Sequence, residues 1–221
     1  MALVATTKDC TQLSDTELAE MADICAEGPS GYEIGTLNKQ AEAWVLCTHV
    51  RDGNALRAFS FSTLERIGGT PAVLLGMAYV KRHSKRDQAL KSLMADNYRR
   101  ALMAFPDEDV LVGSKFNRAD EFEAYKVLVD QIPRPGHKAS GEERAWGRRL
   151  AKRFSVDSTY DDQTFLVKGD GSYPLVLDHE SLKPEATDPE VAKLFKAVKV
   201  KPGDSMITFG WIMAEELLKY A

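Results

Sequence analysis

The sequence predicts one α/β domain built on a mixed β-sheet, and three observations indicate this fold class. Three apolar runs separated by tight turn signals predict an antiparallel meander. A long amphipathic helix and a short β-branched run follow the meander, which is the order of a crossover that brings a strand back in parallel. The chain has 221 residues, of which 44% are hydrophobic and 28% charged, so it can bury a sizeable core.

The N-terminal part predicts a short strand and two helices. Residues 2–6 are small or β-branched and favour a strand. Ser14 and Glu17 form an S-x-x-E capping box that begins a helix, and Gly28 with Pro29 ends it. The apolar face of this helix repeats at helical spacing through Leu18, Met21, Ala22 and Cys25. A second, short helix is expected over residues 37–43.

The meander is expected over residues 44–50, 55–67 and 72–80, and its middle run alternates only in part, which predicts a β-bulge. The next helix ends at Pro106. Its stripe expected to face the core is Ala89, Leu90, Leu93, Met94, Ala101, Leu102 and Phe105, and the side chains expected outside it are Asp96, Arg99 and Arg100. Residues 109–113 predict a central strand that runs parallel to 72–80.

The C-terminal half predicts a helix, a hairpin, a further helix and a final strand with a helix. Asn117 or Asp120 is expected to cap a helix through Phe122, Tyr125, Val127 and Leu128. Ser140 begins a basic helix, which we interpret as a solvated face, with an RNA or acidic-partner surface as the alternative. The Gly-Asp-Gly-Ser turn between 163–167 and 173–177 predicts a β-hairpin. Thr187 and Glu190 predict another capping box, and residues 206–220 predict a strand followed by a helix.

These elements favour one continuous domain over residues 1–221. Its core is expected in residues 1–130, and residues 131–221 are expected to add an inserted helix, the hairpin and C-terminal helices that complete the sheet. A small appended domain after residue 131 is the alternative.

Composition excludes several classes of function. A net charge of −4 argues against a general nucleic-acid binder. Cys10, Cys25 and Cys47 form no CxxC pair and fit buried thiols in a reducing compartment. The histidines lie far apart in the sequence, so we expect no metal. The sequence has neither an apolar run long enough to span a bilayer nor a signal-like N-terminus, and we therefore expect a cytoplasmic protein without a membrane partner.

The loop between residues 72–80 and the following helix carries basic side chains. A helix N-terminus offers unpaired N–H groups and the positive end of the helix dipole, and both favour anions. An anion-binding loop is therefore the functional interpretation, and a solvated basic turn is the alternative. The side chains concerned are Lys81, Arg82, His83, Lys85 and Arg86.

The order of elements resembles the GNAT acyltransferase fold over most of the chain. In that superfamily the fourth strand and the helix after it bind acyl-CoA, with the pyrophosphate on a motif of the form R/Q-x-x-G-x-G/A. The matching positions here are Ser84, Asp87 and Ala89. Ala89 alone fits, because Ser84 replaces the Arg or Gln and Asp87 replaces a glycine that lets the backbone approach phosphate. The cofactor-binding residues that this resemblance implies are Met77, Ala78, Tyr79, Val80, Ser84, Lys85, Arg86, Asp87, Gln88, Ala89 and Asn117.

The resemblance also implies two catalytic residues. Tyr125, which follows Asn117 at nearly the usual spacing, would protonate the leaving CoA thiolate, and Glu65 on the meander would act as the general base. The alternatives are a core aromatic residue for Tyr125 and an ordinary strand carboxylate for Glu65.

Two functions of different classes follow. The first is an acyl-CoA-dependent N-acyltransferase that uses acetyl-CoA or another acyl-CoA as cosubstrate, with a small-molecule or peptide amine as acceptor. The second is a non-catalytic GNAT-like binding module that has lost CoA and binds a partner through its C-terminal half. Either form could be a homodimer.

Overall fold

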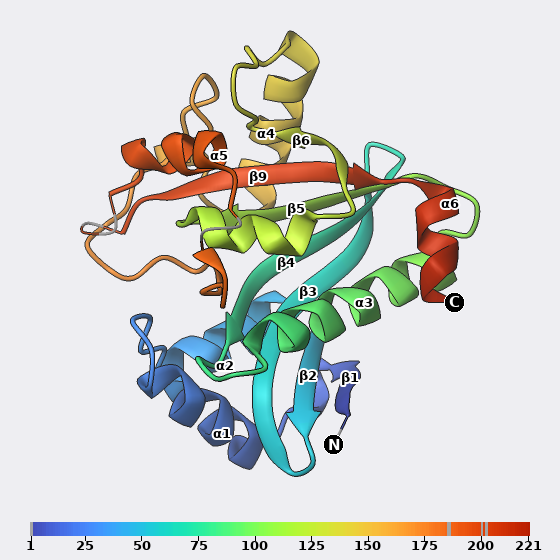
Figure 1. Cartoon of the computed structure of the whole chain (residues 1–221), viewed down its shortest axis with the longest axis vertical. Coiled ribbons are helices and arrows are strands. Elements are labelled where there is room, and N and C mark those ends of the chain that lie inside the picture. The colour runs from blue at the N-terminus through green and yellow to red at the C-terminus, as the bar shows by residue number, and fades with distance from the viewer. Residues whose placement is uncertain (1, 185–186, 200, 202) are drawn as a thin grey trace.

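The computed structural model describes residues 2–184, 187–199, 201 and 203–221. These residues form a mixed sheet of nine strands in the order β1-β2-β3-β4-β5-β9-β6, with β7 paired to β9 and β8 paired to β4 (Figure 1). The fold class is therefore the mixed α/β sheet that the sequence predicts.

The first four strands form an antiparallel sheet, and all of them were predicted. Their bounds are β1 Leu3–Asp9, β2 Leu46–Asp52, β3 Ala55–Ile67 and β4 Thr70–Val80. The register between β2 and β3 shifts after Val50, which pairs with Ala58 while Arg51 pairs with Leu56. One residue of β3 is thus unmatched by β2, which confirms the bulge predicted for the middle strand.

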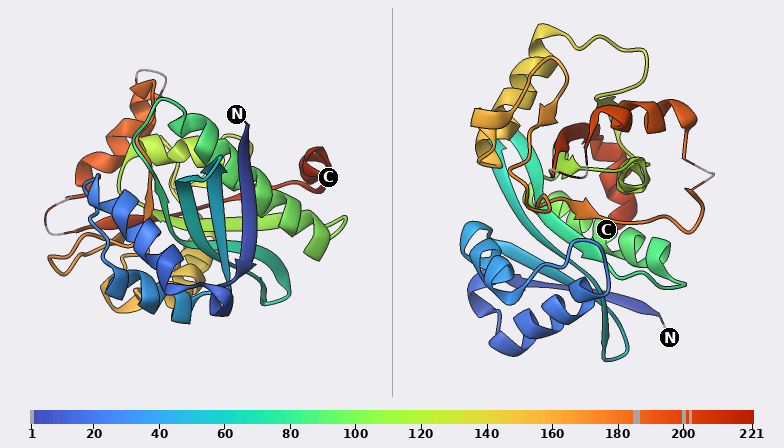
Figure 2. Two further views of the ribbon diagram at one scale, coloured as in Figure 1. Left: turned by 90° about the horizontal axis from the view of Figure 1, so that it is seen from below. Right: turned by 90° about the vertical axis from the view of Figure 1, so that its left-hand side faces the viewer.

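Helices cover both faces of this sheet (Figure 2). The helices α1 Asp15–Ala26 and α2 Ile34–Ala43 pack on one face, and Ser14 caps α1 through the predicted capping box with Glu17. The helix α3 Arg86–Ala104 packs on the opposite face, against alternate residues of the same strands. The C-terminal elements α6 Ala214–Leu217 and η6 Leu218–Tyr220 lie beside α3.

The prediction that Asp96 lies outside the core of α3 is wrong. Its side chain is 5% exposed and accepts hydrogen bonds from Thr7 Oγ1 at 2.5 Å, Arg99 at 2.6 Å and Arg100 at 3.0 Å. Helical periodicity shows which face is apolar, but it does not show that β1 supplies a hydroxyl to a carboxylate on that face.

The strand β5 Val110–Phe116 runs parallel to β4, as predicted, but the two strands pair only where Ala72–Leu74 meet Leu111–Gly113. Beyond this stretch β4 contains a bulge at Gly76, because Phe61 pairs with Met77 while Ser62 pairs with Leu75. A Cβ on Gly76 would lie 1.9 Å from the Trp44 ring, so only glycine fits there. The bulge bends β4, and its C-terminal half separates from β5.

The remaining strands extend the sheet beyond β5. β9 Ser205–Ile212 pairs antiparallel with β5, and β6 Val129–Ile132 pairs antiparallel with β9. Residues 133–204 lie between β6 and β9 in sequence. Their described elements are α4 Gly141–Arg153, η3 Asp157–Thr159, β7 Leu166–Val167, β8 Leu177–Asp178, α5 Pro189–Leu194 and η5 Phe195–Ala197.

The predicted hairpin around the Gly-Asp-Gly-Ser turn is wrong. β7 pairs with β9, and β8 pairs with β4, so the two runs never meet as neighbours. The carboxylate of Asp204 accepts a hydrogen bond from Gly169 N at 3.0 Å and holds the turn beside β9. The edges of β9 and β4 offered unpaired backbone groups, which the sequence of the turn alone does not reveal.

Two helix starts also differ from the predictions. The segment after β5 is a 3₁₀ helix, η2 Ala119–Tyr125, with Arg118 at its N-cap, because the buried Glu121 carboxylate accepts from the N–H groups of Asn117 and Arg118. α5 begins after Asp188, whose side chain accepts from Glu190 N at 2.8 Å, so Thr187 is not its cap. The Ser140 cap of α4 is as predicted.

Candidate functional site

The part of β4 that separates from β5 is paired with a segment from the C-terminal half. Ala78 and Tyr79 pair in parallel with Leu177 and Asp178, and Ala78 N donates to Val176 O at 3.1 Å. We call residues 176–182 the β8 segment. The strand to which the resemblance to the GNAT fold assigns acyl-CoA binding thus carries, on this edge, a piece of the chain itself.

The β8 segment also supplies anionic groups to the basic loop. The Arg82 guanidinium donates to the Asp178 carboxylate, which Arg118 also contacts at 3.1 Å, and the Asp178 side chain is fully buried. Arg86 Nε donates to Glu180 O at 2.5 Å, and its terminal nitrogen donates to Ser181 O at 3.0 Å. The predicted anion-binding loop therefore binds anionic and carbonyl groups of its own chain.

The other basic side chains of the loop have partners outside the β8 segment. Lys81 Nζ lies 2.8 Å from Glu27 Oε1, and Lys85 Nζ lies 2.8 Å from Asp52 Oδ2. His83 Nδ1 accepts from Lys85 N at 3.0 Å.

The first turn of α3 is paired as well. The Asp87 carboxylate accepts from Leu182 N at 3.1 Å, and His179 Nε2 lies 3.2 Å from it. Burial is the main cause that lowers the pKa of His179 to about 4, so the imidazole is neutral near pH 7. Asp87 thus holds the end of the β8 segment at the position where the resemblance places pyrophosphate. Of the neighbouring predicted residues, Ser84 and Gln88 are exposed and Ala89 is buried in the core.

The structure does not bring the two predicted catalytic residues together. Tyr125 is fully buried against Phe116, its hydroxyl donates to Thr208 O at 3.2 Å, and burial raises its pKa. Glu65 forms an ion pair with Arg153 at 3.1 Å, and its partner in β4 is Ala72. Ala72 pairs with Leu111 of β5, and Phe116, against which Tyr125 packs, lies five residues further along that strand, which is roughly 17 Å.

Of the predicted cofactor residues in β4, Ala78 and Tyr79 pair with the β8 segment, and Met77 and Val80 flank that pairing. Met77 and Tyr79 point toward α1 and α2, while Ala78 and Val80 point toward α3. Asn117 is buried at the end of β5, and its N–H donates to Glu121 Oε2 at 2.6 Å.

Sequence reasoning missed two buried acids near this site, Asp178 and Glu121. Glu121 is fully buried, and burial raises its pKa well above the usual value. The run Asp178-His179-Glu180 was the available signal, since an acidic run in the same chain is a natural partner for a basic loop. Nothing in the local sequence of Glu121 distinguishes it from a solvated helix residue.

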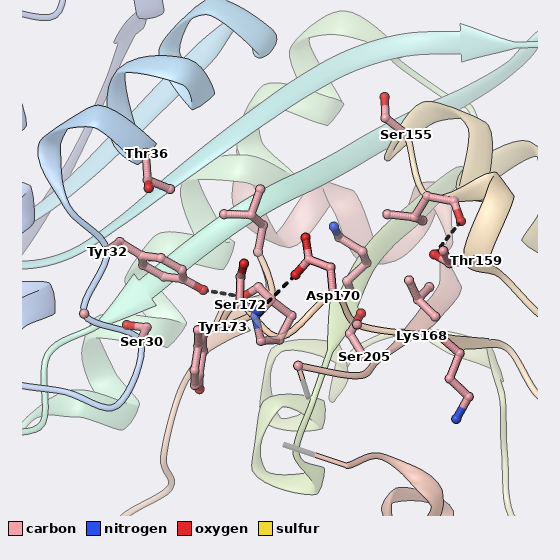
Figure 3. Close-up of a pocket in the computed structure, with 18 of the residues that line it drawn as sticks. Ser30, Tyr32, Thr36, Ser155, Thr159, Lys168, Asp170, Ser172, Tyr173 and Ser205 are labelled. Carbon is pink, nitrogen blue, oxygen red and sulfur yellow. Dashed lines mark hydrogen bonds between the residues drawn. The ribbon is translucent and has the colours of Figure 1, made fainter. Parts of the chain in front are cut away.

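A separate cavity of about 570 Å³ lies between the residues around Tyr32 and those around Thr159 (Figure 3). Its walls come from the loop before α2, from the segment after α4, and from residues 167–175. Lys115 of β5 also lines it, and this side chain was not singled out from the sequence. Lys115 is 6% exposed, its ammonium lies 5.7 Å from the centre of the Phe154 ring, and burial lowers its pKa to about 8.

Acyl-CoA does not fit the arrangement described. Its pantetheine arm would need the backbone edge that Leu177 and Asp178 hold, and its pyrophosphate would need Arg82 and Arg86, which bind the β8 segment. Within the described ranges, no three His, Cys, Asp or Glu side chains gather as a metal site would require. The helices in the same ranges are each too short or too polar to cross a membrane.

The strand order, the meander and the short parallel pairing of β4 with β5 give the chain a GNAT-type fold. No protein-family model matches it, and no curated protein matches its sequence. Similar solved structures include the ribosomal-protein-S18-alanine N-acetyltransferase from Escherichia coli, with 10% identity, 95% of each chain covered and a TM-score of 0.47. The aminoglycoside 6'-N-acetyltransferase from Enterococcus faecium has 10% identity, covers 95% of this chain and 97% of its own, and has a TM-score of 0.44. An acyl-CoA N-acyltransferase from Pseudomonas aeruginosa has 13% identity, coverages of 64% and 94%, and a TM-score of 0.43. These similarities concern the fold and carry no substrate or activity over to this chain.

Proposed function

We propose that this protein is a GNAT-fold binding protein that does not use acyl-CoA and holds its own β8 segment at the acyl-CoA position. One observation carries the proposal. Leu177 and Asp178 pair with the β4 edge, and the Asp178 carboxylate lies on Arg82. An acyl-CoA would use the edge of β4 and the basic loop before α3. The β8 segment occupies both of them.

The chemistry of the β8 segment parallels that of the cofactor it would exclude. Its backbone supplies an amide ladder, as a pantetheine arm would, and Asp178 and Glu180 supply anions near the basic loop, as a pyrophosphate would. Because the segment belongs to the same chain, it competes at a high effective concentration. Binding of acyl-CoA would also separate the buried Asp178 carboxylate from Arg82 and Arg118, and the uncompensated charge would then have to be either buried at a high cost in free energy or exposed to solvent.

Acyl-CoA-dependent N-acyl transfer to a small-molecule or peptide amine is the second candidate function. It is favoured by the limited pairing of the β8 segment, since only two residue pairs join it to β4, and their release would expose the edge. In that case Tyr125 and Glu65 remain the proposed acid and base, with Met77 to Val80, Ser84 to Ala89 and Asn117 as the proposed cofactor residues. Acetyl-CoA, which the resemblance to the GNAT fold implies, is the first cosubstrate to try.

Acetyl-CoA binding separates the two candidates. We expect the wild-type protein to show no thermal stabilisation and no calorimetric heat with millimolar acetyl-CoA. A bound ligand at 100 times its dissociation constant would raise the free energy of unfolding by about 2.7 kcal/mol, which is easily detected. Specific binding by the wild-type protein, together with acyl-dependent release of CoA thiol on a panel of amines, would overturn the proposal.

A variant tests whether the β8 segment is the cause. Asp178→Asn keeps the shape of the side chain but removes the charge that Arg82 and Arg118 neutralise. If the segment excludes acetyl-CoA, this variant should bind acetyl-CoA more tightly than the wild type does. The matched control is Glu108→Gln, which breaks an exposed pair with Arg66 far from the β8 segment and should bind as the wild type does.

A further inference from the structure

The most unusual charged group outside the β8 region is Lys115. Burying an ammonium is costly unless an anion compensates it. Among the residues that the structure describes, no carboxylate forms an ion pair with Lys115, and burial alone accounts for its lowered pKa. Its only described charge-related contact is the face of the Phe154 ring, 5.7 Å away. At pH 7 the amine is still mostly protonated, so the cavity is bordered by a cation that has no counter-ion among the described residues.

The cavity walls carry hydroxyl groups rather than further buried charges. In Figure 3, Ser30, Tyr32 and Thr36 lie on one side of it, and Ser155 and Thr159 lie on the opposite side. Ser30 is 9% exposed, and its Oγ has no hydrogen-bond partner within the described chain. A buried hydroxyl without a partner is a group that a polar ligand would satisfy. The hydroxyl residues of the lining are Ser30, Tyr32, Thr36, Ser155, Ser158, Thr159, Ser172, Tyr173 and Ser205.

Exposed charges at the mouth of the cavity limit the charge of the ligand. Glu33 and Asp170 line it, and both are exposed. Lys168 also lines it, but its ammonium lies 3.3 Å from Asp204 and is therefore partly neutralised. A polyanion such as a nucleoside polyphosphate would be repelled by the two carboxylates, whereas a single carboxylate can reach Lys115.

We propose that this cavity binds a small hydroxylated carboxylate, such as a sugar acid, with its carboxylate on Lys115 and its hydroxyl groups on the serine and threonine walls. The volume of about 570 Å³ is in the range of small-molecule sites. This inference names a ligand class for the binding role proposed above and rests on that role, but it uses a different surface from the β4 edge. Residues 173–175 line the cavity and lead directly into the β8 segment, so the cavity and the segment are joined through a short stretch of chain.

Paired probes test the carboxylate requirement. The full-length protein is titrated by calorimetry with D-gluconate and D-sorbitol, with glycerate and glycerol, and with glucuronate and glucose. Each pair has a similar carbon chain and differs in its carboxylate. We expect at least one carboxylate to bind about 10- to 100-fold more tightly than its neutral counterpart, the usual effect of a charge-assisted hydrogen bond. The proposal is overturned if no carboxylate binds better than its neutral counterpart.

Two variants test the assigned residues. Lys115→Met should remove the preference for the carboxylate, whereas Lys168→Met, which lies at the same cavity but already has Asp204, should change affinity less than about threefold. Ser30→Ala should weaken gluconate binding about 3- to 10-fold and leave acetate binding unchanged. If Lys115→Met does not fold, the paired probes on the wild type and the Ser30→Ala comparison still decide the question.

The outcomes distinguish this inference from the proposed function. Carboxylate binding without acetyl-CoA binding supports both. If neither kind of probe binds, the ligand class is wrong but the loss of acyl-CoA use stands. If acetyl-CoA binds, the proposed function fails, and the paired probes then report only on the Lys115 cavity.

Discussion

Leu177 pairs with Ala78 on the edge of β4 that β5 leaves after Leu74. Leu177 is fully buried in the core that α3 covers, so the β8 segment is held by apolar packing as well as by its ion pairs. This packing explains how a segment with only two strand pairs can stay in place.

We predict that Leu177→Ala lowers the free energy of unfolding by about 2–3 kcal/mol, since a buried leucine loses most of its side chain. Urea unfolding of the wild type and the variant at pH 7 measures this difference in the free energy of unfolding. The control is Leu182→Ala in the same segment, where the side chain is 41% exposed and the change should stay within about 0.5 kcal/mol. Equal, small effects of both variants would show that the β8 segment is loosely attached.

The separation of β4 from β5 depends on Gly76. Gly76→Ala should lower the free energy of unfolding by more than about 3 kcal/mol, because the new Cβ would lie 1.9 Å from the Trp44 ring. In a Trp44→Leu background the same substitution should cost less, and a double-mutant cycle measures the difference.

Gly35→Ala is the control for the Gly76 prediction. Gly35 lies in α2, and beyond its chain neighbours and its own helix backbone nothing lies within 4 Å of a new Cβ, so alanine should be neutral or stabilising by up to about 1 kcal/mol. If Gly76→Ala behaves in the same way, the bulge does not need a glycine.

Much of the fold was predictable because its signals are local. The capping box at Ser14, the turn at Gly68 and the apolar runs depend on a few neighbouring residues, and β2, β3, β4 and α1 appear where those signals place them. The parallel return of β5 followed from the helix between two strands.

The site was less predictable because its contacts are long-range. The basic residue Arg82 was identified from the sequence, but its partner Asp178 is 96 positions away. Residues 163–177 carry the sequence signals of a hairpin. In the structure, however, β7 pairs with the edge of β9 and β8 pairs with the edge of β4, so the two strands do not pair with each other. Lys115 is the one charged residue of the strand Val110–Phe116, and only the three-dimensional structure shows that its side chain borders a cavity.

Two buried histidines should make the protein sensitive to acid. Burial lowers the pKa of both His49 and His179 to about 4, from a usual value of 6.5. The unfolded chain therefore binds protons below pH 6.5 that the folded chain does not bind until about pH 4, so the free energy of unfolding falls as the pH falls through this window. The loss is on the order of 3 kcal/mol for each histidine if the shift is complete.

Urea unfolding at several pH values between 7 and 4 measures this loss. His49→Gln and His179→Gln should each make the dependence on pH shallower. Met21→Leu is the matched control, because Met21 contacts His49 at 3.4 Å but has no titratable group, and it should leave the slope unchanged. A slope that stays the same in both histidine variants would contradict the prediction.

Lys115 should destabilise the protein when no ligand is bound. Its pKa falls from 10.5 to about 8 through burial, so the unfolded chain binds this proton more tightly than the folded chain does. The penalty is fully present below pH 8 and disappears as the pH rises through 10.5, which means that the free energy of unfolding rises across this window.

Lys115→Met should therefore stabilise the ligand-free protein at pH 7 by on the order of 1–3 kcal/mol and abolish the rise, as measured by urea unfolding between pH 7 and 10. Lys219→Met, which removes a 68% exposed side chain on the last helix, should do neither. A loss of stability in Lys115→Met would mean that the ammonium already has an anionic partner in the folded protein, whereas a gain means that the chain retains a costly cation, as a binding site for a carboxylate requires.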